Sequence, residues 1–366
     1  MAFDTTDVIL SLVKIAIVLA MMLQVTPIMA WVERRGSALM QDRPGPNRVG
    51  PFGLFQAFAD ALKFILKEDI IPARAHKWLY TLAPAIGLLP ALTTIAVVPW
   101  GRPFLLAERE VGGRILFEGG RWFVPVVADV SVGILVVFAL ASFSVYGITT
   151  AGWASNNKYS LFGGIRASAQ MISYELALTL AAVSVLLATG SLKLTDVVWH
   201  QTGTFVLFDT LRLPAWNVLS PSMWLSFIVF VVAAFAETNR LPFDFAEADA
   251  ELVAGYHTEY SSMKFALFFM AEYMAMASMS AVIATLYLGG WDIPWYNEPP
   301  TFLGFLLSAL FFVAKVGFLL FFFVWIRWTI PRLKYDILMR LGWKVFLPMA
   351  FVNILLVAGF IAMRWI

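Results

Sequence analysis

Eight apolar segments, each long enough to cross a lipid bilayer as a helix, restrict this chain to the folds of polytopic membrane proteins. A helix needs about 20 residues to cross a hydrocarbon core of about 30 Å. The chain of 366 residues is 60% hydrophobic and 14% charged, whereas about 25% of the residues of a soluble domain are charged. We therefore predict an all-α membrane bundle that forms a single domain over residues 1–366. The predicted spans are residues 8–29, 79–98, 124–148, 165–188, 222–241, 265–289, 302–326 and 345–362.

Residue usage excludes several kinds of cofactor site. The chain has no cysteine, which excludes disulfides, cysteine-ligated iron–sulfur clusters and thiolate metal sites. The three histidines, His76, His200 and His257, are far apart in the sequence, so a metal or haem site is not expected. The sequence also lacks the glycine-rich motifs that bind nucleotides. We therefore expect no redox centre on this chain and no nucleic-acid partner.

Lysine and arginine are distributed unequally between the two sides of the predicted bundle. Of the 26 residues of these types, 17 lie in loops on one side and 7 on the other. Cytoplasmic loops carry an excess of lysine and arginine. The richer side is therefore expected to face the cytoplasm, with both termini on the periplasmic side. That side contains two long connecting segments, residues 34–78 and 237–264.

The first of these segments combines a fixed turn with an amphipathic helix. Residues 42–53 (DRPGPNRVGPFG) contain three prolines and three glycines, a composition that precludes a regular helix. In residues 54–67, polar residues recur every three or four positions opposite a face rich in Phe and Leu. This pattern predicts a helix that lies along the membrane surface. Such a helix either packs there or also frames an opening for a lipid-soluble molecule.

The second segment is acidic. Residues 236–261 contain six of the 24 acidic residues of the chain. Proline is favoured at the first position of a helix, so we expect a helix that begins at Pro242 and carries Asp244, Glu247 and Glu251 on one face. Acids gathered at one membrane edge are typical of proton transfer or cation binding. A solvated acidic face, stabilised in part by the helix dipole, or a docking surface is the alternative.

Several ionisable residues fall inside the predicted spans. Each costs about 2.5–3.5 kcal/mol at the centre of a membrane helix, so we expect them to face protein or water. Glu175 and Lys315 lie near the middle of their spans and are candidates for function. Glu272 lies eight residues after Lys264 in its span, and Asp129 lies near the outer end of its span. Only 15 residues precede Glu237 in its span, which is fewer than the roughly 20 that a helix needs to cross the hydrocarbon core. That helix is therefore expected to continue and to draw Glu237 into the membrane.

Two motifs closely resemble those of one membrane subunit, the H subunit, of proton-pumping NADH–quinone oxidoreductase, which is respiratory complex I. They are WVERRGSALMQDRPGPNRVGPFGLFQAFADALKFILKED at residues 31–69 and AETNRLPFDFAEADAELVAGYHTEYS at residues 236–261. The resemblance covers essentially the whole chain. The departures are mild: Asp249 stands where Glu is common, His257 where Asn is common and Ala246 where Pro is frequent.

The resemblance implies a quinone-access tunnel and the start of a carboxylate pathway that couples quinone chemistry to proton translocation. The implied quinone-chamber residues are Arg34, Arg35, Arg43, Arg48, Phe55, Phe58, Asp60 and Lys63. The implied proton-relay residues are Glu33, Asp60, Glu175, Glu237, Asp244, Glu247, Asp249 and Glu251. No residue is implied as a redox catalyst or as a metal ligand.

The resemblance also implies a substrate, a location and partners. The substrate is a quinone, either ubiquinone or menaquinone, and the location is the bacterial inner membrane. The partners are the cytoplasmic-side iron–sulfur and quinone-site subunits, the small membrane subunits that lead to antiporter-like subunits, and membrane lipid.

Two alternatives stay open at the level of the sequence. The nearer one is the homologous membrane subunit of a membrane-bound hydrogenase or of a ferredoxin- or deazaflavin-linked dehydrogenase. The more distant one is a stand-alone ion-coupled transporter, which is expected to show repeated halves with interrupted helices. The sequence has no visible internal repeat, and its acids gather at one edge.

Overall fold

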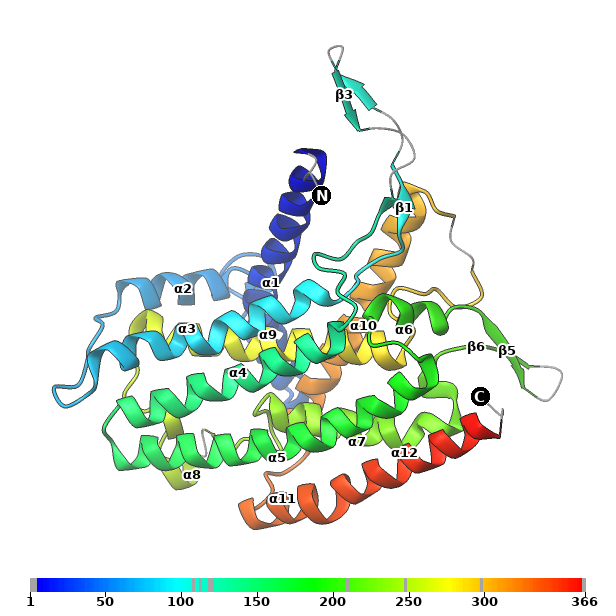
Figure 1. The fold of residues 1–366 in the computed structure, drawn as a ribbon. Helices are drawn as coiled ribbons and strands as arrows, with labels where there is room; N and C mark the ends of the chain where they lie inside the picture. Colours follow the sequence, from blue (N-terminus) through cyan, green and yellow to red (C-terminus); the bar gives the residue numbers. More distant parts are fainter. Residues whose placement is uncertain are drawn as a thin grey trace.

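The computed structural model describes residues 5–106, 109–111, 114–117, 122–207, 211–246, 249–296 and 299–363. They form a bundle of long helices with short β-hairpins at one side (Figure 1). The helices are α1 (Thr5–Met40), α2 (Gln56–Leu66), α3 (Lys77–Thr94), α4 (Gly133–Ala154), α5 (Lys158–Thr189), α6 (Leu194–His200), α7 (Trp224–Glu237), α8 (Asp249–Leu252), α9 (Ser262–Tyr287), α10 (Phe302–Thr329), α11 (Tyr335–Leu341) and α12 (Leu347–Ala362).

The strands pair only with near neighbours in the sequence. All pairs are antiparallel, and the hairpins do not extend into a larger sheet within the described residues. The pairs are β1 (Phe104–Leu105) with β4 (Trp122–Phe123), β2 (Arg109–Val111) with β3 (Arg114–Phe117), and β5 (Thr204–Leu207) with β6 (Leu211–Pro214).

The predicted all-α membrane fold is confirmed. The described residues contain seven helices that are long and apolar enough to cross a membrane. The remaining predicted span, residues 222–241, corresponds to the shorter apolar segment Pro221–Glu237. Regular helix ends at Glu237, so the prediction that this helix continues beyond that residue is wrong.

Several predicted helix ends also differ from the observed ones. α1 continues to Met40, so Arg34 and Arg35 are helical, although we assigned them to a loop. α4 begins at Gly133 and α5 at Lys158, whereas we predicted starts at residues 124 and 165. The apolar residues of 124–132 lie in an irregular segment, and the start of α5 is instead fixed by the side chain of Asn157, which accepts a hydrogen bond from the Tyr159 amide (2.9 Å).

One edge of the bundle gathers the ends of α1, α4, α7 and α10 with the beginnings of α3, α5, α9 and α11. The end of α4 and the beginnings of α3 and α5 lie at the left of Figure 1. We call this side of the bundle the acidic edge, because the described residues of the acidic segment 236–261 lie there. Contacts between segments far apart in the sequence connect it. The Tyr80 hydroxyl donates to the Glu259 carbonyl (2.6 Å), and the Leu333 amide donates to the Pro242 carbonyl (3.3 Å). The opposite edge carries the hairpins and α6.

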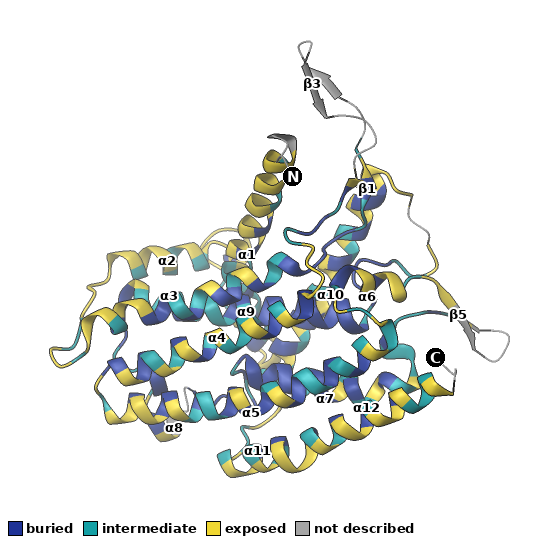
Figure 2. Ribbon diagram, in the orientation of Figure 1, coloured by how far each residue is buried: buried dark blue, intermediate teal, exposed yellow. Residues whose placement is uncertain are grey.

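α9 is the central helix of the bundle. Over an apolar stretch of 18 residues in α9, 61% of the residues are buried, compared with 11% over a stretch of the same length in α1. Figure 2 shows the same contrast, with much of α1 exposed. Neighbouring helices approach closely where residues are small: a Cβ on Gly147 of α4 would lie 2.6 Å from the amide nitrogen of Gly87 of α3. α1 therefore offers a surface to lipid or to a neighbouring subunit, whereas α9 is surrounded by the rest of the chain.

Lys315, a mid-span lysine that we considered for function, stabilises the end of α9. Its ammonium donates to the carbonyls of Leu288 (2.6 Å), Gly290 (2.8 Å) and Asp292 (2.8 Å). It also lies 4.1 Å from the centre of the Trp216 ring. A cation is favoured where the carbonyls of a helix C-terminus converge. These contacts give the lysine a structural role, and its functional role stays a prediction.

Candidate functional site

A buried group of charged side chains lies at the acidic edge between α1, α9 and α10. Its centre is Glu33, which is 6% exposed. The Glu33 carboxylate accepts a hydrogen bond from the Tyr273 hydroxyl (2.6 Å) and pairs with the guanidinium groups of Arg240 (3.4 Å) and Arg327. The Nε of Arg240 lies 2.7 Å from an oxygen of Glu272. We call these five residues the Glu33 cluster.

The chain direction after α7 places Arg240 in this cluster. Asn239 has a φ of +50°, a left-handed conformation that asparagine tolerates better than most residues. The chain then turns back, and the Arg240 amide donates to the Phe235 carbonyl (3.2 Å). Gln170 of α5 holds the following turn by donating to the Phe243 carbonyl (2.7 Å). The ETNR motif therefore ends a helix and turns its arginine into the bundle.

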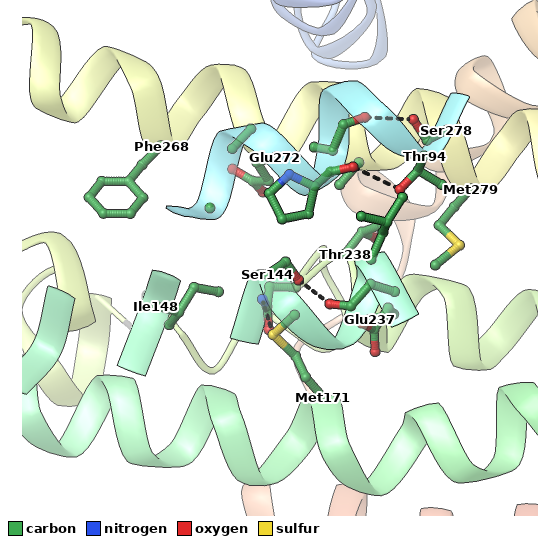
Figure 3. A pocket seen from close by; sticks show the side chains of 18 of the residues that line it. Thr94, Ser144, Ile148, Met171, Glu237, Thr238, Phe268, Glu272, Ser278 and Met279 are labelled. Atoms are coloured by element: carbon green, nitrogen blue, oxygen red, sulfur yellow. Dashed lines mark hydrogen bonds between the residues drawn. The ribbon is translucent and has the colours of Figure 1, made fainter. Parts of the chain in front are cut away.

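A cavity with a volume of about 80 Å³ adjoins the cluster, between α3, α4 and α9. Glu237 and Glu272 both line it, together with the hydroxyl residues Thr94, Ser144 and Ser278 (Figure 3). The rest of the wall is mainly apolar. A water molecule needs about 10–15 Å³ of such space and two to four polar partners. The cavity therefore has room for several water molecules between two carboxylates.

Glu237 reaches the cavity from the last turn of α7. It is 5% exposed, and neither carboxylate oxygen has a hydrogen-bond partner among the described residues. Glu175 lies one turn of α5 beyond Met171, which lines the cavity, and it accepts a hydrogen bond from Ser142 of α4. Glu33, Glu272, the cavity, Glu237 and Glu175 thus form a row of acids that enters the bundle from the acidic edge.

The predicted relay residues divide into two groups. Glu33, Glu175 and Glu237 belong to the row of acids. The others whose side chains are described pair with arginines outside it: Asp60 with Arg34, Asp244 with Arg332 (3.2 Å) and Glu251 with Arg166 (2.6 Å). Glu247 lies outside the described residues, and so does the side chain of Asp249, the first residue of α8.

The predicted helix from Pro242 is not formed. Residues 241–246 form turns, and α8 is a short helix that begins only at Asp249. Phe243 and Phe245 are 4% and 0% exposed. Residues two apart point to different sides of a helix, so burying both phenylalanines in one core favours a turn over a helix. The prediction of a shared helix face is therefore wrong for Asp244, which lies in the turn, and Glu251, which lies in α8, while Glu247 lies outside the described residues.

The far end of the acidic segment is fixed by two stacked tyrosines. The rings of Tyr80 and Tyr260 lie 4.1 Å apart at an angle of 4°. The Tyr260 hydroxyl donates to the Tyr80 carbonyl (3.1 Å). Burial raises the pKa of Tyr260 well above its ordinary value, so this hydroxyl stays protonated and remains a donor. Asn157 also donates to the Glu259 carboxylate (2.5 Å).

The predicted proline- and glycine-rich turn is confirmed. Gly53 has a φ of +73°, and a Cβ there would lie 2.3 Å from the Pro46 carbonyl oxygen, so a larger residue would not fit. Arg35 of α1 donates to the carbonyls of Pro46 (3.4 Å) and Phe52 (3.3 Å). The Trp31 indole donates to the same Phe52 carbonyl (3.0 Å). These contacts hold the turn against the end of α1.

The predicted amphipathic helix is confirmed as α2. None of its 11 described residues is buried, and Phe58 on its apolar face is 52% exposed. Asp60 connects α2 to Arg34 of α1. At its other end, the Ser262 hydroxyl at the start of α9 donates to the Phe64 carbonyl (2.9 Å). α2 therefore lies at the acidic edge, attached at two points and open along one face.

The predicted quinone-chamber residues do not form one group with the buried acids. Arg34 and Arg35 hold α2 and the turn, as described above. Asp60 is half-buried and pairs with Arg34, and the remaining predicted chamber residues are exposed on the turn, on α2 or just before it: Arg43, Arg48, Phe55, Phe58 and Lys63.

Four residues of the Glu33 cluster were missed as site residues by the sequence analysis. Glu272 carried a signal, as an acid inside a span, and Arg240 lies in the ETNR motif. Tyr273 carried no signal apart from its position next to Glu272, and Arg327 none apart from its position at a span end.

Comparisons with known proteins agree on one family. The sequence profile of the NADH dehydrogenase family matches residues 13–358. An NADH-quinone oxidoreductase H subunit of Koribacter versatilis is 43% identical over 97% of this chain and 98% of its own length. The corresponding H subunit of Geobacter metallireducens is 45% identical over 98% of both chains, and that of Salinibacter ruber is 46% identical over 93% of both.

These names favour the respiratory enzyme over the hydrogenase and transporter alternatives. The membrane-spanning helices and the acidic edge described above agree with them. The chain therefore belongs to the NADH dehydrogenase family, as an H subunit of NADH-quinone oxidoreductase, and is a multi-pass membrane subunit of respiratory complex I.

Proposed function

We propose that this subunit provides the quinone-access path and the first part of the proton-coupling pathway of a proton-pumping NADH–quinone oxidoreductase. The observation that carries the proposal is the row of acids, in which Glu33 and Glu237 are buried and Glu272 and Glu175 are half-buried. Glu272 belongs both to the Glu33 cluster and to the wall of the cavity that Glu237 lines. A chain that only anchored the complex would not need carboxylates at these depths, because each is costly in a membrane helix.

Charge displacement at the acidic edge is the proposed link between quinone reduction and proton movement. A unit charge at about 10 Å, in an effective dielectric of about 20, changes the energy of a carboxylate by about 1.7 kcal/mol. That energy changes a protonation equilibrium more than tenfold. Carboxylates that interact this strongly titrate as a set. Reduction of a quinone near the Glu33 cluster therefore redistributes protons along the row, through water in the cavity.

The electrons come from a neighbouring subunit, because a chain without cysteine cannot hold an iron–sulfur cluster by cysteine ligation. This chain contributes residues that guide the quinone and respond to its charge. In this proposal the turn 42–53 and α2 lie at the mouth of the path. Arg34 and Asp60 fix α2 relative to α1, which keeps the mouth in place.

The mouth can be tested through the length of the quinone tail. The variant Phe58→Glu places a charge on the open apolar face of α2. The apparent KM for a long-tailed quinone should rise roughly fivefold to tenfold, because the tail has to pass a polar site, at a cost of the order of 1 kcal/mol or more. The KM for a short-tailed analogue should change by less than about twofold. Steady-state kinetics of the assembled enzyme measure both, and Phe58→Leu, which keeps the face apolar, is the control. Equal effects on the two quinones would leave α2 as a packing helix only.

We further propose that the acidic edge faces the cytoplasm, on the strength of the 17 to 7 distribution of lysine and arginine. The natural absence of cysteine makes a direct test possible. A single cysteine in place of Asn47, on the exposed turn, should react with a membrane-impermeant maleimide in inside-out vesicles and not in intact spheroplasts. The reverse pattern would invert the orientation and contradict docking of the electron-donating subunit at this edge.

A further inference from the structure

Besides the apolar face that the proposed function places at the mouth of the quinone path, α2 carries a basic groove on its exposed surface. An open groove is lined by Ala59, Leu62, Lys63, Leu66 and Lys67. Leu62 and Leu66 are 60% and 85% exposed. The groove therefore presents a pair of leucines and a pair of lysines, and the two members of each pair are four residues apart. No described part of the chain covers this side of α2.

The charge of this groove is not neutralised by the nearby acids. Asp60 is paired with Arg34, and Asp69 with Lys264 (2.8 Å). Glu68 is exposed but does not line the groove. Within the described part of the chain, neither Lys63 nor Lys67 forms an ion pair. The groove is therefore a local site of positive charge.

The depth of α2 in the membrane limits what can occupy the groove. α2 is attached to α1 near its end through Arg34 and to the beginning of α9 through Ser262, and both helices cross the membrane. α2 thus lies where the hydrocarbon core meets the headgroups. An amphipathic helix at this depth places its apolar side chains among acyl chains, and its lysines extend toward the headgroups.

We propose that this groove binds an anionic phospholipid of the surrounding leaflet. Its phosphate group lies between Lys63 and Lys67, and an acyl chain lies along Leu62 and Leu66. The charge complementarity selects an anionic lipid over a zwitterionic one, and the adjacent leucines select a lipid over a free anion. Basic residues at a membrane surface each strengthen the attraction to anionic lipid, so the two lysines together should enrich such a lipid severalfold.

The test identifies the lipid that lies next to the groove. Photoreactive benzoylphenylalanine replaces Leu66, the most exposed groove residue, and the whole complex is reconstituted in vesicles of phosphatidylcholine and phosphatidylglycerol at a ratio of three to one. After illumination, mass spectrometry of this subunit gives the lipid composition of the adducts. The ratio of phosphatidylglycerol to phosphatidylcholine among the adducts should be at least fivefold higher than in the vesicle, because each lysine near the surface contributes a factor of up to about five. In the double variant Lys63→Gln and Lys67→Gln the adducts should match the vesicle composition.

Two controls make the outcome decisive. Lys158→Gln removes one exposed lysine of the same edge that does not line the groove, and it should leave the enrichment unchanged. Inorganic phosphate, at an ionic strength matched with chloride, should not displace the lipid. The proposal is overturned if phosphatidylglycerol is not enriched, if its enrichment survives loss of both lysines, if phosphate alone abolishes it, or if the adducts form mainly with another subunit. This readout does not depend on quinone turnover, so it is independent of the proposed function.

Discussion

Replacing Arg240 with methionine should destabilise the assembled subunit by about 3–5 kcal/mol, the cost of leaving a buried charge without its partner. Arg240 is 3% exposed and lies between the carboxylates of Glu33 and Glu272. Methionine fills a similar space but removes the positive charge that separates the two acids. Arg327 still faces Glu33, so Glu272 is the acid whose environment changes most.

The effect can be measured as the fraction of complex assembled on native gels and as the temperature of thermal inactivation. Arg212→Met is the matched control, because Arg212 lies exposed on β6, and it should change stability by less than about 0.5 kcal/mol. The double variant Arg240→Met with Glu272→Gln should recover part of the loss, since it removes the unpaired charge. Normal assembly and thermal stability of Arg240→Met alone would show that the Glu33 cluster does not depend on this arginine.

Replacing Glu237 with glutamine should lower NADH–quinone turnover at least tenfold while leaving assembly intact. Glutamine keeps the size of the side chain but cannot release a proton. The Glu237 carboxylate makes no hydrogen bond to the described residues, so the amide disrupts no protein contact that the structure describes. A structural role therefore predicts little effect on rate, whereas a relay role predicts a large one.

The matched control for this variant is Glu68→Gln, which removes an exposed carboxylate at the same edge. It should leave the rate within about twofold of the unmodified enzyme, because an exposed carboxylate exchanges protons with solvent and not with the row. A Glu68→Gln rate as low as that of Glu237→Gln would mean that the loss reflects the total charge of the edge.

The sequence predicted those features that depend on local patterns. Long apolar runs identified the spans, since an apolar segment of sufficient length has few alternatives in a membrane. The spacing of polar residues in 54–67 identified α2, because its faces are set by helical geometry alone. Burial of Glu237 followed from the short apolar run before it. The cause of this burial differs from the predicted one. Helix α7 ends at Glu237, and the turn after it encloses this residue in place of a continued helix.

The Glu33 cluster could not be predicted, because it depends on the packing of distant elements. Glu33, Tyr273 and Arg327 belong to three helices whose mutual rotation no local pattern specifies. The turn at 241–246 was mistaken for a helix because Pro242 and the acids after it fit the rules for a helix N-terminus. The burial of Phe243 and Phe245 outweighed those local preferences. Tertiary contacts therefore determine the geometry of the acidic site, whereas local sequence patterns determine which segments form the membrane-spanning helices and α2.

Simultaneous measurement of quinone reduction and proton uptake in sealed vesicles, with assembled complex carrying Glu237→Gln, tests most directly whether the buried acids relay protons. If Glu237 is a relay, both rates should fall together at least tenfold relative to the unmodified complex and to Glu68→Gln, at equal amounts of assembled enzyme. Full rates of quinone reduction and proton uptake in the Glu237→Gln complex would contradict the relay, and the row of acids would then be a structural feature of the edge.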